Sequence, residues 1–443
     1  MEIGNVVFEG IDCIYSREWK TIYLSPVNER DFFKLELYKR RHFFIKFSRG
    51  CDNTIAYIDN SDFYKVGTYI LNAEFIFSYV SSNPDDSLRM TCMEFTGKDL
   101  DAVYNPTLHY YRETNHGRDG LGVDLLYSHE KVESFTLALD DKSLQVEIYL
   151  GNILKNGVLG DNKLHTQLVV SFDQTEDVLF IYRIYSLVVR FLQILLYKRK
   201  VGFRHIEVLN ETDISDRSLL GYLWVEKNTE EPLEALRNFR LQPHFQQIMQ
   251  LLASDGTTYV NHLPMNQQVF RKYETIDILT AFSAFESECH KDRVTFIQTS
   301  VDFSEVKAEI ETLIGPLEQK YPLEKYSVFF KSLYDRIRSI GVEFGEKQRV
   351  INAYQVCLNI LEGTTREYPK NDNIQIAAER IVKMRNKAIH HNYFPDTDNG
   401  DNICIELLHL IYYAMVFRRA GVPDDITELS LDDVFHCNNK LLS

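Results

Sequence analysis

The sequence has seven cysteines but no pair of them at the close spacing that zinc-binding and redox motifs use. Their number is odd and they are scattered along the chain, which argues against a framework of disulfide bonds. We therefore expect reduced thiols, a cytoplasmic protein and no thiolate metal site. The cysteines are Cys13, Cys51, Cys92, Cys289, Cys357, Cys404 and Cys437.

Positive charge is scarce as well. The chain has 49 lysines and arginines against 64 aspartates and glutamates, so its formal net charge is -15. A surface that binds a polyanion over a broad area needs concentrated lysine and arginine. The composition excludes such a surface, and any site for nucleic acid has to be small and local.

Long uninterrupted apolar runs are missing. The most membrane-like segment is 178–200, but Arg183 and Arg190 interrupt it on one helical face, which predicts a buried amphipathic helix and no membrane partner. The first residues, MEIGNVVFEGID, have no basic region followed by an apolar one, so we expect no secretory signal. The sequence shows no internal repeat, low-complexity tract or Gly/Ser linker.

The residues that are present change their pattern along the chain. Up to about residue 173, apolar and polar residues alternate in short segments separated by turn residues, which predicts an antiparallel β-rich domain at 1–173. The segment 104–120 breaks this pattern and is either a plain surface loop or a recognition loop. The predicted strands include 32–38, 42–48, 53–59, 74–80, 135–140, 144–150 and 164–172.

The rest of the chain has mostly helical spacing. A mixed helical bridge is expected at 174–267, with helices at 178–200 and 230–254 around a short strand-like piece. From 268 to 443 the spacing predicts an all-α bundle, so the fold class is α+β and multidomain. The helical segments of the bundle are 274–293, 302–319, 326–340, 348–363, 373–391 and 402–422, the last ending near Gly421.

One of these helices ends in a cationic segment, RNKAIHH, at residues 385–391. Apolar residues recur along this helix at intervals of three and four and form a single stripe that would pack into the bundle. The stripe consists of Ile374, Ala377, Ile381, Met384 and Ala388.

The stripe determines where the polar residues of this helix point. At about 100° per residue, Arg385 lies about 60° from the centre of the stripe. Asn386 and His390 share a face that points nearly opposite the stripe. His391 lies on the other border, so we expect it to be packed or half-buried while His390 is exposed.

Four cations lie within eight residues of this helix, with no acid among them. In an acidic chain, an anionic ligand would be drawn to such a place. From this helix alone two interpretations stay open, an anion-binding site and an ordinary solvated polar face. The four cations are Arg380, Lys383, Arg385 and Lys387.

The sequence from Arg385 to His390 reads R-N-K-A-I-H and resembles the R-N-x-x-x-H motif of HEPN ribonucleases. The motif lies on a late helix of an all-α C-terminal region, as in that family. An earlier segment, FSAFESECH with Glu286 and Glu288, is similar to the first helix of a HEPN domain. The two-part layout resembles abortive-infection proteins of the ApeA type, which join a β-rich domain to a C-terminal HEPN domain.

The resemblance implies an antiphage endoribonuclease that needs no metal and no cofactor. A histidine can take or give a proton at neutral pH, and an arginine can neutralise charge that develops on a phosphate. The 2′-OH of RNA would attack, leaving a 2′,3′-cyclic phosphate. The implied catalytic residues are Arg385, Asn386 and His390, the auxiliary candidates are His391, Lys387 and Glu286, and the RNA-binding candidates are Arg380 and Lys383.

The geometry of one helix adds an expectation about assembly. Arg385 and His390 lie about 140° apart and about 7.5 Å along the axis, so one helix cannot easily aim both at one phosphate. HEPN domains meet this need by dimerising, which predicts a homodimer. The resemblance further implies an RNA substrate, with tRNA as a candidate, a phage-derived activator, and an N-terminal domain that senses infection and restrains the nuclease.

Two other functions compete with cleavage. The helical domain could be a non-catalytic HEPN module that binds RNA, nucleotides or a partner protein. A metal enzyme built on His390 and His391 is disfavoured, because adjacent residues of a helix point about 100° apart.

Overall fold

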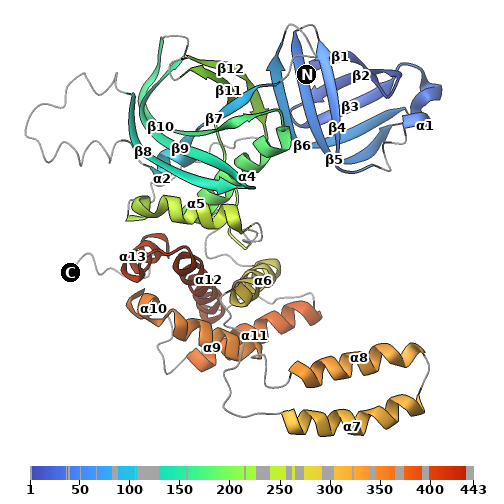
Figure 1. Ribbon diagram of the computed structural model, residues 1–443, viewed down its shortest axis with the longest axis vertical. Helices are drawn as coiled ribbons and strands as arrows, with labels where there is room; N and C mark the ends of the chain where they lie inside the picture. Colours follow the sequence, from blue (N-terminus) through green and yellow to red (C-terminus); the bar gives the residue numbers. More distant parts are fainter. Residues whose placement is uncertain are drawn as a thin grey trace, which may run out of the picture. The chain divides into compact units, whose positions relative to one another are not determined.

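The chain folds into two compact units, Met1–Gly256 and Thr257–Ser443, which Figure 1 draws in one view. An antiparallel β-rich region is followed by a region whose described residues are helical or lie in short connections, so the coarse α+β class is confirmed. The computed structural model describes residues 2–35, 37, 40–49, 51–65, 67–81, 88–104, 106, 129–155, 158–213, 216–225, 240–255, 262–264, 274–291, 304–321, 324–339, 345–364, 374–391 and 399–435.

The N-terminal unit is built on one twelve-stranded sheet in which every described pairing is antiparallel. Its strands are β1 (Glu2–Phe8), β2 (Ile11–Glu18), β3 (Thr21–Pro26), β4 (Phe43–Arg49), β5 (Asp52–Lys65), β6 (Thr68–Val80), β7 (Met90–Thr96), β8 (His129–Leu139), β9 (Lys142–Lys155), β10 (Val158–Thr175), β11 (His205–Asp213) and β12 (Asp216–Trp224). The order is β1-β2-β3-β6-β12-β11-β7-β10-β9-β8, with β4 and β5 joined to β6.

Strand β6 connects the two parts of this sheet. One of its edges pairs with β3 through its first half and with β12 through its second half, while the other edge pairs with β5. Alternate residues of β3 and β6 are buried, as expected for strands with one face on a core. The residues of β1 to β6 therefore surround a core of their own, which includes Ile22, Leu24, Tyr69 and Leu71.

The segment 32–38 was predicted as a strand, and this prediction is wrong. Its first residues form the short helix α1 (Phe32–Leu35), which follows a 3₁₀ turn, η1 (Glu29–Asp31), capped by Asn28. Phe32 and Leu35 are both buried, a spacing of three that suits one helical turn. A short apolar run cannot distinguish a strand from a helix by periodicity alone.

The other six predicted strands are confirmed, with differences of one residue at the start of β4 and at the end of β8, in β4, β5, β6, β8, β9 and β10. Strands β1, β2, β3, β7 and β12 were not predicted. Of the segment 104–120, residues 105 and 107–120 lie outside the described part of the chain, so the choice between a surface loop and a recognition loop stays a prediction.

Helix α4 (Val178–Leu196) is the predicted amphipathic helix and belongs to the core of this unit. Phe180 packs edge-on against Phe172 of β10, and Tyr182 stacks on Phe75 of β6 at 4.6 Å between ring centroids. By length and composition α4 is the only described helix that could span a membrane, but 61% of its apolar window is buried inside the protein. Such burial is what a core helix shows.

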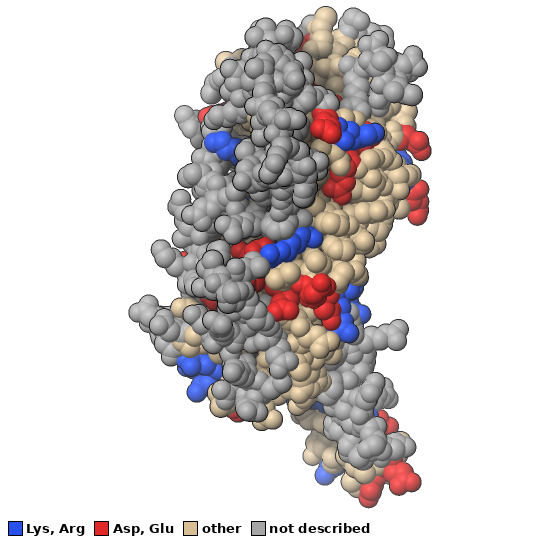
Figure 2. Space-filling view, turned by 90° about the vertical axis from the view of Figure 1, so that its left-hand side faces the viewer, with Lys and Arg blue, Asp and Glu red and all other residues tan. Residues whose placement is uncertain are grey.

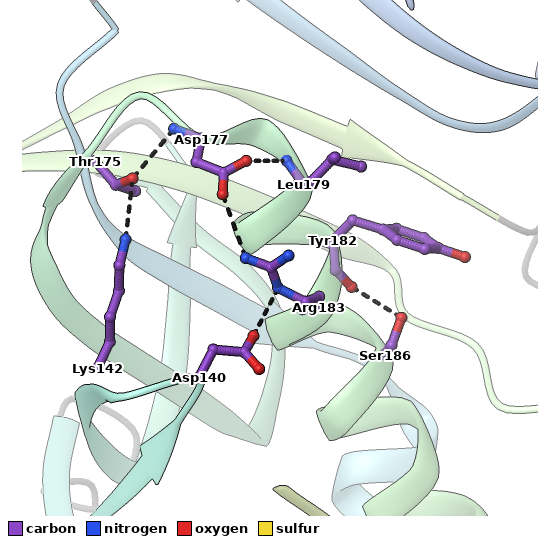
Figure 3. A network of polar contacts seen from close by, with 8 residues as sticks. All are labelled: Asp140, Lys142, Thr175, Asp177, Leu179, Tyr182, Arg183 and Ser186. Carbon is purple, nitrogen blue, oxygen red and sulfur yellow. Dashed lines mark hydrogen bonds and ion pairs between the residues drawn. The ribbon is translucent and has the colours of Figure 1, made fainter. Parts of the chain in front are cut away.

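A two-residue turn joins β8 to β9 and ties this hairpin to the start of α4 (Figure 3). Asp140 and Asp141 both have positive φ angles, 50° and 62°, which is the geometry of a type I′ turn. Asp177 caps α4 by accepting a hydrogen bond from Leu179 N at 2.9 Å. Arg183 bridges the two, with Nε 2.7 Å from Asp140 and Nη2 3.3 Å from Asp177.

Helix α5 (Phe245–Ser254) covers the outer edge of β8 with two glutamine side chains. Gln250 accepts from Ala138 N at 2.9 Å and donates to Ala138 O at 3.3 Å, while Gln246 donates to Thr136 O at 2.9 Å. These amides take the place of a neighbouring strand. They protect an edge that would otherwise be open to another chain.

The bridge predicted at 174–267 does not form a unit of its own. Strands β11 and β12 complete the sheet between β7 and β6, and α4 and α5 pack on that sheet, so residues up to Gly256 belong to the N-terminal unit. The helix predicted at 230–254 begins at Phe245, after the 3₁₀ turn η5 (Gln242–His244), and residues 226–239 lie outside the described part.

The C-terminal unit contains eight described helices. They are α6 (Thr275–Lys291), α7 (Ser304–Lys320), α8 (Glu324–Ser339), α9 (Glu346–Val356), α10 (Leu358–Thr364), α11 (Ile374–His391), α12 (Asn399–Arg419) and α13 (Asp424–Phe435). Helix α12 packs on α6, α9, α11 and α13, and its residues from Cys404 to Phe417 are nearly all buried. It is the central helix of the bundle.

The predicted bundle helices are confirmed with two differences. The segment 348–363 forms two helices, because the chain turns at Cys357 and its N–H donates to Ala353 O and Gln355 O. Helix α13 was not predicted. Gly421 ends α12 as predicted, with a φ of 79° and with Val422 N donating to Phe417 O at 3.0 Å.

A buried ion pair holds the end of α4 to helix α2 (Lys98–Val103). Lys198 Nζ lies 2.6 Å from Asp99 Oδ1, and Gly202 N donates to Asp99 Oδ2 at 2.8 Å. Both charged side chains are buried, so each charge needs the other to offset the free-energy cost of its burial.

We predict that Lys198→Met lowers the free energy of unfolding by about 3 kcal/mol, because it leaves the Asp99 carboxylate buried without its cation. Urea unfolding followed by tryptophan fluorescence measures this, since both tryptophans, Trp19 and Trp224, belong to the N-terminal unit. The control is Lys131→Met, which breaks an exposed pair with Glu147 and should cost under about 1 kcal/mol. Equal losses in the two variants would contradict the prediction.

A buried histidine lies in the middle of the helical unit. His409 of α12 is 1% exposed, and burial lowers its pKa from 6.5 to about 3. Its ring lies 5.3 Å from that of His262, which in turn packs on Tyr412. The folded chain therefore keeps this imidazole neutral at pH values where the unfolded chain protonates it.

The lower pKa of His409 in the folded chain predicts a loss of stability in acid. The contribution of His409 is fully present above pH 6.5 and is lost as the pH falls from 6.5 toward 3, because the unfolded state then binds one more proton. Between pH 6.5 and 5, the wild type should lose about 2 kcal/mol more than His409→Leu, which cannot titrate. Urea unfolding followed by circular dichroism at 222 nm measures both proteins, and parallel pH profiles would refute the assignment.

Candidate functional site

Helix α11 carries the motif, and its apolar stripe is buried as predicted. The five side chains of the stripe are 1% to 4% exposed and face α6, α9 and α12. This contact determines the rotation of the helix about its axis. The stripe consists of Ile374, Ala377, Ile381, Met384 and Ala388.

Arg385 lies at the border between this buried stripe and the surface. Its Nη1 is 2.8 Å from Glu346 Oε1, at the start of α9, and donates to Asn386 Oδ1 at 3.0 Å. The guanidinium carbon lies 5.3 Å from the ring centroid of Phe282 on α6. The arginine side chain is one-quarter exposed, so three neighbours hold it while solvent still reaches it.

The other two motif residues lie farther from the core. His390 is exposed and Asn386 is half-buried, in agreement with a shared face opposite the stripe. Ile389 lies between this face and Arg385 and is 44% exposed, which is unusual for a large apolar side chain. The outward face of α11 therefore presents an imidazole, an amide and an apolar group together.

Acids from neighbouring helices pair with part of the cationic segment. Arg380 Nε lies 2.6 Å from Asp401 Oδ1 of α12, just as Arg385 meets Glu346. Lys383 and Lys387 are exposed. The sequence showed no acid within this stretch of α11, but the fold supplies two from other helices, so the local excess of positive charge is smaller than the sequence indicates.

Charge is mixed on the one face that Figure 2 shows. On the face shown in Figure 2, lysine and arginine atoms lie beside aspartate and glutamate atoms, without a broad area of positive charge among the coloured residues. This agrees with the net charge of -15. An anion would be bound through a few local groups and not by a wide basic surface.

The two acids of α6 have different surroundings. Glu286 is half-buried and accepts from Arg349 Nη1 of α9 at 3.0 Å. Glu288 is fully buried and forms a two-point ion pair with Arg419 of α12, at 2.5 and 3.0 Å. Glu288 therefore joins α6 to α12 within the core, whereas Glu286 lies one helical turn from Phe282, on the same side of α6 as the motif arginine.

The sequence did not indicate Glu346 or Phe282 as members of the site. Glu346 follows Gly345 at the start of a helix, where acids are common, so its position alone gave no reason to connect it with Arg385. The two residues come together only through the packing of α9 on α11. The side chain of His391 lies outside the described part, so its predicted half-burial is not tested.

The site combines the exposed imidazole of His390 with the guanidinium of Arg385, which contacts an amide and a carboxylate. Across the residues that the structure describes, no cluster of three or more His, Cys, Asp or Glu side chains could hold a metal ion. An exposed imidazole can transfer protons, and an arginine can bind a phosphate with paired N–H groups. Asn386 fixes the orientation of the guanidinium through its hydrogen bond.

Comparisons with protein-family models, with curated proteins and with solved structures find no match for this chain. The interpretation of the site therefore depends on its own residues and on the sequence motif.

We predict that Glu346 and Arg385 stabilise each other by about 1 kcal/mol, since their contact is close but partly solvated. A double-mutant cycle of Glu346→Gln and Arg385→Met, followed by urea unfolding, isolates this coupling. The reference cycle uses the more exposed pair of Lys347 and Glu379, 3.7 Å apart, where the coupling should be several times smaller. A coupling at Glu346 and Arg385 no larger than the reference would contradict the contact.

Proposed function

We propose that the C-terminal unit is a metal-independent endoribonuclease of the HEPN type. In this proposal two copies form the active site, the N-terminal unit restrains it, and the protein acts in antiphage abortive infection. The observation that carries the proposal is the R-N-x-x-x-H motif on α11, with its arginine held at a helix border and its histidine exposed.

The proposed reaction follows from the chemistry of RNA. A histidine takes the proton of a 2′-OH, and the oxygen attacks the adjacent phosphorus. The bond from phosphorus to the 5′-oxygen breaks, and that oxygen receives a proton from a second imidazole. The products are a 2′,3′-cyclic phosphate and a 5′-OH. Atoms and protons balance without an oxidant, a metal or a cofactor.

A homodimer would supply the second imidazole. His390 of each copy would contribute, one as base and one as acid, with the Arg385 side chains neutralising the charge that develops on the phosphate. The exposed Ile389 supports contact between two α11 helices, because an apolar group beside the motif gains by burial. Lys383 and Lys387 are exposed and available to RNA.

Glu346 gives the proposed site a resting state. Glu346 Oε1 lies 2.8 Å from Arg385 Nη1, and an RNA phosphate would pair with the same guanidinium. RNA therefore has to displace Glu346 or share the arginine with it, and Arg380 would likewise have to leave Asp401 to bind RNA. Restraint by the N-terminal unit, a phage-derived activator and tRNA as the target come from the resemblance alone.

A second candidate function is RNA binding without cleavage. The ion pair between Arg385 and Glu346 favours it, because an arginine that stays with its carboxylate cannot stabilise a transition state. The exposed lysines and His390 would then form an anion-binding surface.

We predict that Arg385→Ala and His390→Ala each reduce cleavage of total RNA by at least about 100-fold in the presence of EDTA, since each removes a group that acts on the phosphate. Gel analysis of the RNA measures cleavage, and circular dichroism checks the fold. His42→Ala, an exposed histidine of the N-terminal unit, is the matched control and should cleave normally.

If Arg385→Ala cleaved RNA as fast as the wild type, Arg385 would not have the catalytic role assigned to it. Activity that disappears in EDTA and returns with a metal would overturn the proposed chemistry. Binding of RNA by the wild type without cleavage, under conditions that trigger toxicity in cells, would support the second candidate instead.

A further inference from the structure

Helices α7 and α8 form an antiparallel hairpin with a small core. Its buried side chains are Ile314, Phe330 and Ile337, with a few half-buried residues around them. Each helix packs on the other, and neither makes an extensive contact with another described helix or strand. The rings of Tyr321 and Tyr326 lie 5.9 Å apart near the turn and fix the register of the two helices.

The hairpin exposes large apolar side chains on one face. Val306, Leu313 and Leu317 of α7 are 54%, 67% and 50% exposed, and Phe329 of α8 is 60% exposed. Successive residues of a helix point about 100° apart around its axis. The exposed side chains of α7 point about 90° away from the line that joins α7 to α8, and Phe329 points about 75° away from the same line. Because the helices are antiparallel, these rotations bring both groups to the same side.

A face of this kind is incomplete as it stands. A helical pair is one layer, and stable folds bury the apolar side of a layer against a second layer. Large apolar side chains that gather exposed on one face are typical of interaction surfaces. Val328 is also exposed, at 73%, but it points directly away from α7, on the outer edge of α8, among Lys331, Ser332 and Asp335.

The charges of the two helices indicate which partner fits. Helix α7 carries four glutamates and two lysines, whereas α8 carries four cations and two acids. A layer with the opposite arrangement, a basic helix over α7 and an acidic helix over α8, would complement both. A second copy of the same hairpin, related to the first by a two-fold axis parallel to the helices, provides this arrangement.

We propose that α7 and α8 pair face to face with the same hairpin of a second copy and form an antiparallel four-helix bundle. In this bundle every neighbouring pair joins one α7 to one α8, so acidic and basic helices alternate. The register places Leu317 of one copy over Phe329 of its partner. The contact is isologous, so each copy buries both residues.

This inference does not depend on the proposed nuclease activity. It concerns a surface on α7 and α8, whereas the proposed active site lies on α11. The assembly can therefore be measured without RNA, and a result that disproves one proposal does not disprove the other.

The first test is the self-association of the full chain by sedimentation equilibrium. Leu317→Glu places a charge in the proposed contact and should raise the dissociation constant of the assembly at least tenfold. Val328→Glu is the matched control, because it adds the same charge to an exposed position on the outer edge of α8, outside the proposed contact. It should leave the dissociation constant unchanged.

The second test is a disulfide between copies. The double variant Leu317→Cys and Phe329→Cys should form covalent dimers under mild oxidation, because the two positions face each other across the proposed axis. Each single variant should form few, since identical positions lie diagonally across the bundle. The wild type, with its native cysteines, gives the background.

Three results would overturn the inference. Unchanged self-association of Leu317→Glu, together with no covalent dimer above background, would mean that the face is not an interface between copies. A lower melting temperature of Leu317→Glu without a change in mass would mean that the chain itself covers the face. Equal cross-linking by either single variant would exclude the alternating arrangement.

Discussion

Burial of one apolar stripe on α11 constrains everything else about the candidate site. Five side chains from Ile374 to Ala388 fill the interior of the bundle, so the helix cannot rotate without exposing them. That rotation puts Arg385 at the border with α6 and α9 and turns Asn386 and His390 outward. The motif is therefore presented by packing, and each of its residues has a different environment although they share one helix.

The neighbouring helices change the electrostatics of this segment. Glu346 and Asp401 come from α9 and α12 and pair with two of the four cations. The buried Glu288 and Arg419 pair joins α6 to α12 at the same time. The bundle is thus crossed by ion pairs between helices, and a ligand anion has to compete with carboxylates that are already in place. If the proposed function holds, this competition keeps the site inactive until the two carboxylates are displaced.

Sequence patterns predicted the helical part well because its elements are long and periodic. The stripe of α11, the exposure of His390 and the end of α12 at Gly421 all follow from local spacing and glycine chemistry. The strand predicted at Phe32 failed because two buried residues at a spacing of three fit either structure once the segment is short. Contacts such as that of Glu346 with Arg385 join residues far apart in the chain, and local patterns carry no information about them.

The N-terminal sheet shows the same limit on a larger scale. Alternation identified many of its strands, but the place of β11 and β12 between β7 and β6 depends on pairing at long range. The side chains that protect the edge of β8 come from Gln246 and Gln250 on a helix more than a hundred residues away. Local patterns therefore missed that the segment from α4 to α5 belongs to the sheet.

The central claim is that the outward face of α11 meets a ribose-phosphate chain. Site-specific photo-cross-linking to RNA tests it most directly, with the cross-linking residue placed in turn at Asn386, His390 and Ile376. Ile376 is 66% exposed on the same helix but lies about 21 Å from His390 along the axis. The account predicts RNA adducts from 386 and 390 and few from 376. Equal adducts from all three positions, or none from 390, would contradict it.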